Sequence, residues 1–413
     1  MRFDLFSSRA FPSSSGPQVI LLSTLVFLVA LVLLVPALVF CLECAMAMLP
    51  FRARTPESGA PRPSVAVLIP AHNEELTMEA AILTVLPELA PQDRLVVIAD
   101  NCTDKTGDLA RKRGAIVIER AEPDRRGKGY ALSYGLQFLA KDPPQAVVML
   151  DADCTVSTGT VEKLARCARD SGRPVQARYS FELPSKPDPL AAVSAFAFLV
   201  KSLRPRGLHR LGLPCALMGS GMAIPWSLID KVVLDEGNLV EDLQWGLDLA
   251  LAGHPPMLCP GAEVTPRHPQ QSKGAMSQRR RWEHGHLATL IGRGPRLVAR
   301  AVRSGRLDLM ALALDLCVPP LSLLILMTTI AMGGALLTVE LGASWIPLGV
   351  LAFSAALVIL TVAAAWWRFG RTSIPAIALL FAPVYVLWKV CLYRDFLVRR
   401  QKVWVRTERE LDR

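Results

Sequence analysis

The sequence predicts an α/β fold attached to a membrane: a Rossmann-type, mostly parallel sheet, with one transmembrane helix before it and two or three after it. Between residues 64 and 269, short apolar runs alternate with helical patterns over short connections, which is typical of a parallel sheet covered on both faces. Uncharged apolar blocks long enough to cross a bilayer stand only outside that range. With 413 residues, 52% of them hydrophobic, the chain is long enough for both parts.

The N-terminal part carries one predicted span. Residues 1–17 are polar, rich in serine and proline, and expected to be disordered. Residues 18–42 hold no charge over 25 positions, and at about 1.5 Å per residue such a helix crosses a hydrocarbon core of about 30 Å. The block is too long for the apolar region of a signal peptide, so it predicts a retained anchor. Arg52, Arg54 and Arg62 follow it, which places the next domain in the cytoplasm, under the cytoplasmic (inner) membrane.

The C-terminal part carries two more predicted spans, at 309–339 and 345–367. Asp315 and the pair Pro319-Pro320 interrupt the first of them. Either Asp315 lines a polar passage, or the membrane helix simply starts after it.

One further apolar segment, 373–396, contains Pro383, Lys389 and Arg394. Because the tail at 397–413 is basic, we favour an interfacial helix over a third C-terminal span.

The formal net charge of +10 does not indicate nucleic acid. Lysine and arginine flank the apolar blocks, as in the basic interfacial segment at 291–308, and no pattern of aromatic and basic residues suited to base stacking is present. We therefore expect membrane lipid, and no nucleic acid, among the partners.

Two carboxylates follow the central predicted strand. Residues 147–150 form an unbroken apolar run, as in a strand buried on both faces, and Asp151 and Asp153 come where that strand ends. Ligands of open α/β sheets bind at this edge. Two carboxylates one residue apart suit Mg²⁺ or Mn²⁺, which prefer oxygen ligands. The alternative is a turn with two solvated aspartates.

Other polar motifs follow predicted strands or open predicted helices. Predicted strands at 65–69 and 95–99 lead into polar turns, and a third lies at 115–119. Taken in order, the motifs resemble those of membrane-embedded family-2 glycosyltransferases, such as cellulose, hyaluronan, chitin and poly-N-acetylglucosamine synthases. The series is 69–74 (IPAHNE), 100–104 (DNCTD), 127–129 (GKG), 151–153 (DAD), 219–221 (GSG), 241–242 (ED) and 278–282 (QRRRW).

The resemblance implies a GT-A-like catalytic domain over 64–290 that binds a nucleotide sugar, with UDP as the expected nucleotide. Asp153 would ligate the metal, and Asp151 would contact ribose or support the metal. Lys128 would reach the base or the diphosphate, although it could equally be a solvated lysine at a helix start. The implied nucleotide contacts are Pro70, Ala71, Glu74, Asp100, Lys128, Asp151, Arg280 and Arg281.

One position departs from the family pattern. Asn101 stands where a second aspartate is usual, and an amide donates as well as accepts hydrogen bonds. The identity of the base is therefore less firmly implied than the class of enzyme.

By the same resemblance, Asp242 is the candidate general base, with Glu241 beside it. Both acids also suit the first turn of a helix for reasons of charge alone. A single base facing the leaving nucleotide implies an inverting displacement. The implied acceptor contacts are Gly219, Ser220, Gly221, Gln278 and Trp282, and Trp404, Thr407 and Arg409 match a short W-x-x-T-x-R gating segment.

The expected function is inverting, metal-dependent transfer of a sugar to a growing β-linked surface polysaccharide. Because few spans are visible, a translocation pore would need a homo-oligomer or a secretion partner. One alternative is the addition of one or a few sugars to a lipid-linked acceptor. Another, from a different class, is a membrane sensor that binds sugar nucleotides without turnover.

Overall fold

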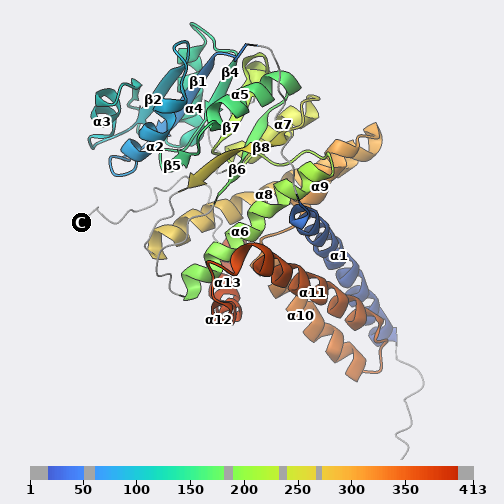
Figure 1. Ribbon diagram of the computed structural model, residues 1–413. Helices are drawn as coiled ribbons and strands as arrows, with labels where there is room; N and C mark the ends of the chain where they lie inside the picture. Colours follow the sequence, from blue (N-terminus) through green and yellow to red (C-terminus); the bar gives the residue numbers. More distant parts are fainter. Residues whose placement is uncertain (1–16, 51–60, 181–188, 232–239, 267–271, 399–413) are drawn as a thin grey trace, which may run out of the picture.

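The computed structural model describes residues 17–50, 61–180, 189–231, 240–266 and 272–398. The predicted disorder at 1–16 and the possible gating residues Trp404, Thr407 and Arg409 lie outside these ranges. A sheet domain stands on a layer of long helices, and apolar helices extend from the other side of that layer (Figure 1).

The domain is built on an eight-stranded sheet of order β3-β2-β1-β4-β7-β6-β8-β5. Neighbours from β3 to β4 are parallel, as predicted. Beyond β4 the sheet is mixed, because β7 runs antiparallel to β4 and β6, β6 is parallel to β8, and β5 is antiparallel to β8. The strands are β1 (Val65–Ala71), β2 (Arg94–Asp100), β3 (Ile116–Arg120), β4 (Ala146–Met149), β5 (Cys154–Val156), β6 (Val175–Tyr179), β7 (Met222–Pro225) and β8 (Met257–Pro266).

Alternate residues of the central strands bury themselves on opposite faces of the sheet, as a pleated strand requires. In β1, Val65 and Val67 pack in a core with α2 (Met78–Val85) and α5 (Thr160–Ser171). Leu68 packs in a second core on the other face, with α4 (Lys128–Leu139) and α7 (Glu241–Leu251). The remaining short helices of the domain are α3 (Thr106–Lys112), η1 (Leu86–Glu88) and η2 (Trp226–Lys231).

Four helical segments of the described chain are long and apolar enough to cross a membrane: Pro17–Met48, Leu321–Glu340, Ile346–Gly370 and Ala376–Val398. The first is α1 and the second is α10. The third joins α11 (Ile346–Ala365) to η3 (Trp366–Gly370), and the fourth joins α12 (Ala376–Leu379) to α13 (Ala382–Val398). The preference for an interfacial helix at 373–396 stays a prediction.

The predicted span at 309–339 is wrong at its start. The chain forms α9 (Leu307–Cys317), breaks at Pro319-Pro320, and begins α10 at Leu321. Proline lacks the amide hydrogen that a continuing helix needs. Asp315 therefore lies on α9 and outside the span, which is the second of the two alternatives.

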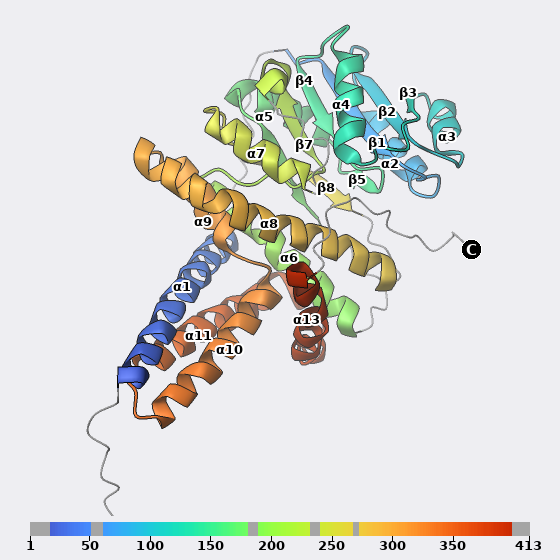
Figure 2. The same ribbon diagram turned by 180° about the vertical axis from the view of Figure 1, so that it is seen from behind.

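Three helices separate the sheet domain from the apolar helices: α6 (Pro189–Arg210), α8 (Ser272–Ser304) and α9 (Figure 2). The basic segment predicted at 291–308 forms the second half of α8, a turn and the start of α9. Gly207 lets α6 approach α1 closely, since a Cβ there would lie 1.8 Å from the carbonyl oxygen of Glu43.

A buried ion cluster joins three helices at this approach. Arg204 of α6 donates from Nε to Oε2 of Glu43 at 2.6 Å and binds the Asp315 carboxylate. Its guanidinium also donates to the backbone oxygen of Asp315 at 2.6 Å. The cluster ties α1, α6 and α9 together under the sheet domain.

Candidate active site

A pocket of 290 Å³ opens where β1, β2 and β4 end, and the interfacial helices α6, α8 and α9 form its other wall. Its lining includes Pro70 and Ala71 from the end of β1, Glu74 just beyond, Asp100 from the end of β2, and Asp151 after β4. The edge of the parallel strands thus gathers these predicted positions in one place, although β1, β2 and β4 lie far apart in sequence.

Asp100 is already engaged at the far end of this edge. Its Oδ1 accepts from Nη1 of the buried Arg120 at 2.6 Å and from Nδ2 of Asn101 at 3.0 Å. Burial raises the pKa of Asp100, and Arg120 opposes that rise. Asn101 has φ of 51°, a left-handed conformation that asparagine tolerates better than most residues.

One group of the described residues offers metal ligands close together. Ligand atoms of Asp151, Asp153 and Cys154 lie within 4.8 Å of one another. Burial raises the pKa of the Cys154 thiol well above its ordinary value. Sulfur is also a soft ligand that Mg²⁺ and Mn²⁺ do not prefer. The donor set that remains is two carboxylates, which fits Mg²⁺ or Mn²⁺.

Lys128 is a half-buried partner of these acids. Its Nζ lies 2.5 Å from Oδ1 of Asp151 and donates to the backbone oxygen of Gly219 at 2.5 Å. Oε1 of Glu241 is 3.9 Å away. Burial lowers the pKa of Lys128, but Asp151 and Glu241 outweigh it and raise the pKa overall. The alternative of a solvated lysine is therefore wrong.

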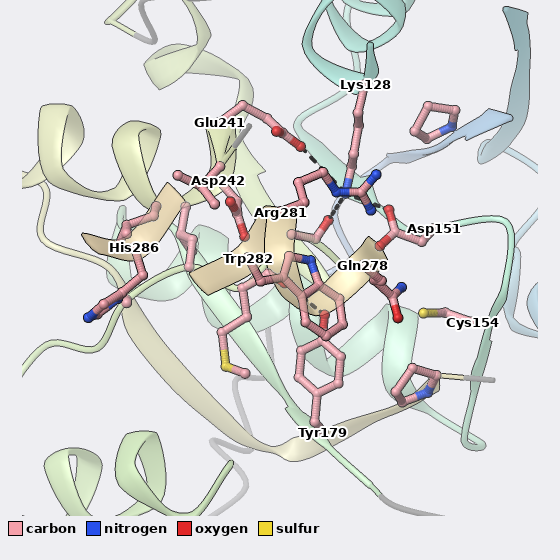
Figure 3. A pocket seen from close by; sticks show the side chains of 18 of the residues that line it. Lys128, Asp151, Cys154, Tyr179, Glu241, Asp242, Gln278, Arg281, Trp282 and His286 are labelled. Atoms are coloured by element: carbon pink, nitrogen blue, oxygen red, sulfur yellow. Dashed lines mark hydrogen bonds and ion pairs between the residues drawn. The ribbon is translucent and has the colours of Figure 1, made fainter. Parts of the chain in front are cut away.

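Glu241 and Asp242 enter the pocket from the first turn of α7, and Figure 3 shows Asp242 and Asp151 approaching from different sides. Burial raises the pKa of Glu241 to about 7, and Lys128 opposes the rise. Burial also raises the pKa of Asp242 above its ordinary value. A carboxylate with a raised pKa is a stronger base, which suits proton removal near neutral pH.

A tight turn at 219–221 separates the two acidic groups. Gly219 has φ of 88°, and a Cβ there would meet Oδ2 of Asp242 at 2.9 Å, so only glycine fits. Gly219 lines the pocket, but Ser220 is fully buried and its Oγ accepts from the Asp151 amide at 3.0 Å. Gly221 packs against Val264, which would lie 2.4 Å from a Cβ. Ser220 and Gly221 are buried in the turn and do not line the pocket. Their predicted acceptor contacts are therefore wrong.

Two residues of β6 that sequence reasoning missed hold this turn. Gln176 donates to the carbonyl of Ser220 and accepts from the amide of Met218, both at 2.8 Å. The Tyr179 hydroxyl donates to the carbonyl of Met218 at 2.9 Å and accepts from the amide of Ser220 at 3.1 Å. A glutamine or tyrosine in a strand pattern carries no signal of such a role.

The helix α8 presents one face to the pocket. Gln278, Arg281 and Trp282 line the cavity. Arg280 turns away and pairs with Asp395 of α13 at 2.5 Å, so its predicted contact with a diphosphate is wrong. At about 100° per residue, Gln278, Arg281 and Trp282 share one face of the helix, whereas Arg280 lies about 200° from Gln278, on the opposite side.

Trp282 belongs to a chain of aromatic rings. Its centroid lies 6.1 Å from that of Phe198, which in turn lies 5.9 Å from that of Tyr179. Phe198 and the neighbouring pocket residue Lys201 come from α6, and no motif in the sequence marked either of them.

The fold and the site together define a class: a GT-A-like mixed α/β domain with an acidic pair at its ligand-binding edge, joined to helices able to span a membrane. The sequence pattern of glycosyltransferase-like family 2 matches residues 61–285, more than half of the chain. The chain belongs to glycosyltransferase-like family 2, so the predicted family is confirmed. Its placement among the cellulose and hyaluronan synthases stays a prediction.

Two curated relatives are similar to this chain over part of its length. A probable glycosyltransferase of Bacillus subtilis is 25% identical over 238 residues, which cover 55% of this chain and 56% of the relative. A low-salt glycan biosynthesis hexosyltransferase of Haloferax volcanii is 37% identical over 109 residues, 26% of this chain and 25% of the relative. The chain thus covers about half, or less, of the length of these relatives.

One solved structure shares the fold of this chain over nearly the whole length of the solved protein. It is a mannosyltransferase of Pyrobaculum calidifontis in complex with GDP-mannose and Mn²⁺, 18% identical to this chain. The superposition has a TM-score of 0.52 and covers 88% of this chain and 99% of the other. This similarity supports the predicted α/β, GT-A-like fold.

Proposed function

We propose that this protein is a metal-dependent glycosyltransferase that moves a sugar from a nucleotide sugar to an acceptor at the membrane surface. One observation carries the proposal: Asp151, Asp153 and Asp242 line the same pocket, and Asp151 and Asp242 enter it from different sides (Figure 3). A single bound sugar can therefore lie between a metal-bound diphosphate and a base.

The strand edge is assigned to the donor. Asp151 and Asp153 would hold Mg²⁺ or Mn²⁺, which when bound neutralises the leaving diphosphate. Arg281 forms no hydrogen bond or ion pair with the described residues. The acids that act most strongly on its charge are Glu241, Asp151 and Asp153. Its guanidinium is therefore available for diphosphate oxygens. The resemblance favours UDP, whereas the Pyrobaculum mannosyltransferase was solved with GDP-mannose and Mn²⁺.

The chemical step is a single displacement. The acceptor oxygen attacks the anomeric carbon, the bond from that carbon to the diphosphate oxygen breaks, and the acceptor proton passes to Asp242. Because Asp242 faces Asp151 across the pocket, attack comes from the side opposite the leaving group, and the configuration at the anomeric carbon inverts.

The packing of the membrane helices bears on the acceptor. The resemblance favours a growing β-linked polysaccharide, which needs a passage through the membrane. Helices α1, α10 and α11 instead share one apolar core with α6. This packing favours the second candidate, the addition of one or a few sugars to a membrane-bound acceptor. The positive-inside pattern supports a site on the cytoplasmic side, which stays a prediction, as does a homo-oligomer or a secretion partner.

The donor assignment predicts that Asp153→Ala weakens nucleotide binding in the presence of metal. The reason is that one of only two hard ligands is lost. Titration of UDP and GDP into native and variant protein, each with Mn²⁺ and with EDTA, measures the effect. The variant with metal should match the native protein in EDTA, while Asp124→Ala, at an exposed aspartate outside the pocket, should behave as native. Equal affinities under all conditions would mean that the acidic pair is structural.

A panel of UDP- and GDP-linked sugars, assayed for nucleotide release, separates the transferase from the sensor. The transferase releases nucleotide from at least one donor when metal is present. Tight binding with no release from any donor, with every acceptor tried, would support the sensor.

Trp282→Ala should raise the acceptor KM about 3- to 10-fold, the size of an aromatic stacking contribution. Nucleotide affinity should change little, since the resemblance assigns the indole, which packs near Phe198, to the acceptor. Initial rates at varied acceptor concentration, beside nucleotide titrations, measure both quantities. Equal loss of both, with a lowered melting temperature, would show instead that the indole supports the fold.

A further inference from the structure

We infer that the acceptor is an amphiphile with an anionic head group and an apolar tail, and that Lys201 binds the head group. This inference rests on the proposed function, because it assigns a substrate class to the acceptor end of the same pocket.

The pocket changes character away from the strand edge. Its wall away from that edge is lined by apolar side chains from α6, α7 and α9. These residues are Phe198 and Pro205 of α6, Leu243 and Leu247 of α7, and Leu312 and Leu316 of α9. Helices α6 and α9 lie between the sheet domain and the membrane helices, and α7 belongs to the sheet domain (Figure 1). A sugar polymer needs hydrogen-bonding groups along its path, whereas such a wall suits a hydrocarbon chain.

Lys201 is the cation at this end that has no anion. It follows Phe198 by one helical turn on the pocket-facing side of α6, and its side chain is exposed to the cavity. It forms no hydrogen bond or ion pair with any residue that the structure describes. Arg204, the next pocket residue along α6, is by contrast engaged by Glu43 and Asp315.

Arg281 and Lys201, the two pocket cations without an ion pair to the described residues, lie at different ends of the pocket. The acids that act most strongly on Arg281 are Glu241, Asp151 and Asp153, at the donor end. The charges that act most strongly on Lys201 are those of Arg204, Asp242 and Glu283, at the acceptor end. An ammonium beside apolar groups can bind the anionic group of an amphiphile through charge-assisted hydrogen bonds. Lys201 is therefore placed to hold an anionic group close to the nucleophile that Asp242 serves.

The surroundings of α6 explain how the tail leaves the pocket. Helix α6 packs against α1, which is long and apolar enough to span the membrane. Leu312 and Leu316 of α9 extend the apolar wall of the pocket. Helix α9 lies in the same layer as α6 (Figure 2). A tail that follows this wall passes from the head group at Lys201 into the lipid.

Binding of three matched probes to the full-length protein tests the inference. Farnesyl phosphate, palmitate and farnesol are titrated in non-ionic detergent, with Mn²⁺ and UDP present, against native protein, Lys201→Gln, Lys201→Arg and Lys141→Gln. Lys141 is an exposed lysine outside the pocket and serves as the charge-matched control.

The native protein should bind at least one anionic probe about tenfold or more tighter than farnesol, as charge-assisted hydrogen bonds allow. Lys201→Gln should lose this preference, while Lys201→Arg and Lys141→Gln keep it. The tighter of farnesyl phosphate and palmitate identifies a phosphate or a carboxylate head.

Equal affinities for all three probes in the native protein, or a preference that survives in Lys201→Gln, would overturn the inference. Nucleotide release by the native protein from the donor panel reports on the proposed function separately. Loss of the lipid preference alone leaves that function intact, and absence of release alone leaves the lipid site intact.

Discussion

Asp242→Asn is expected to lower the rate of sugar transfer by about 10²- to 10⁴-fold, the usual contribution of a positioned general base. The amide keeps the shape of the side chain beside Gly219 but cannot take the acceptor proton. Nucleotide affinity should stay close to native, because Asp242 lies across the pocket from Asp151 (Figure 3). Single-turnover rates and nucleotide titrations measure the two effects separately.

The exposed Asp124→Asn is the matched control for this substitution and should transfer sugar at the native rate. A loss of nucleotide binding in Asp242→Asn as large as the loss of rate would assign Asp242 to the donor site. Native activity in that variant would remove it from the mechanism.

Replacing Arg204 should give the largest loss of stability. Its side chain is only 11% exposed, and it forms ion pairs with both Glu43, which is 2% exposed, and Asp315. Removing one partner of such a buried cluster typically costs about 3 to 5 kcal/mol, because the remaining charges are left unpaired. Arg204→Met should therefore unfold at a markedly lower temperature in detergent than the native protein.

Two further variants separate charge from packing at this cluster. Arg125→Met, at an exposed site of the sheet domain, should keep the native melting temperature. Adding Glu43→Gln and Asp315→Asn to Arg204→Met should restore part of the loss, since no unpaired charge then remains. A melting temperature unaffected by Arg204→Met would mean that the cluster does not join α1, α6 and α9.

The strand edge was predictable because local patterns specify it. An apolar run followed by Asp151 and Asp153 predicts both a buried strand and the place where it ends, and the same holds for Ala71 and Asp100. The order of motifs along the chain then indicated the family. The mixed half of the sheet was less predictable, because short strands such as β5 and β7 carry few residues from which to infer direction.

Contacts between distant segments escaped sequence reasoning. Lys128 contacts Gly219 and Glu241, and no residue near Lys128 in the sequence predicts either contact. Arg280 was misassigned because the adjacent Arg281 has the same chemistry, and only the direction of the helix face distinguishes them. The partnership of Arg204 with Glu43 spans 161 positions, which no periodicity can reveal.

The anomeric configuration of the first-formed product tests most directly the claim that Asp151, Asp153 and Asp242 act on one sugar from opposite sides. Proton NMR of the product, recorded before further transfer, measures it. The account predicts a configuration opposite to that of the donor, so an α-linked nucleotide sugar gives a β-glycoside. A product that retains the donor configuration would contradict it, because the attacking oxygen would then have arrived on the same side as the leaving diphosphate.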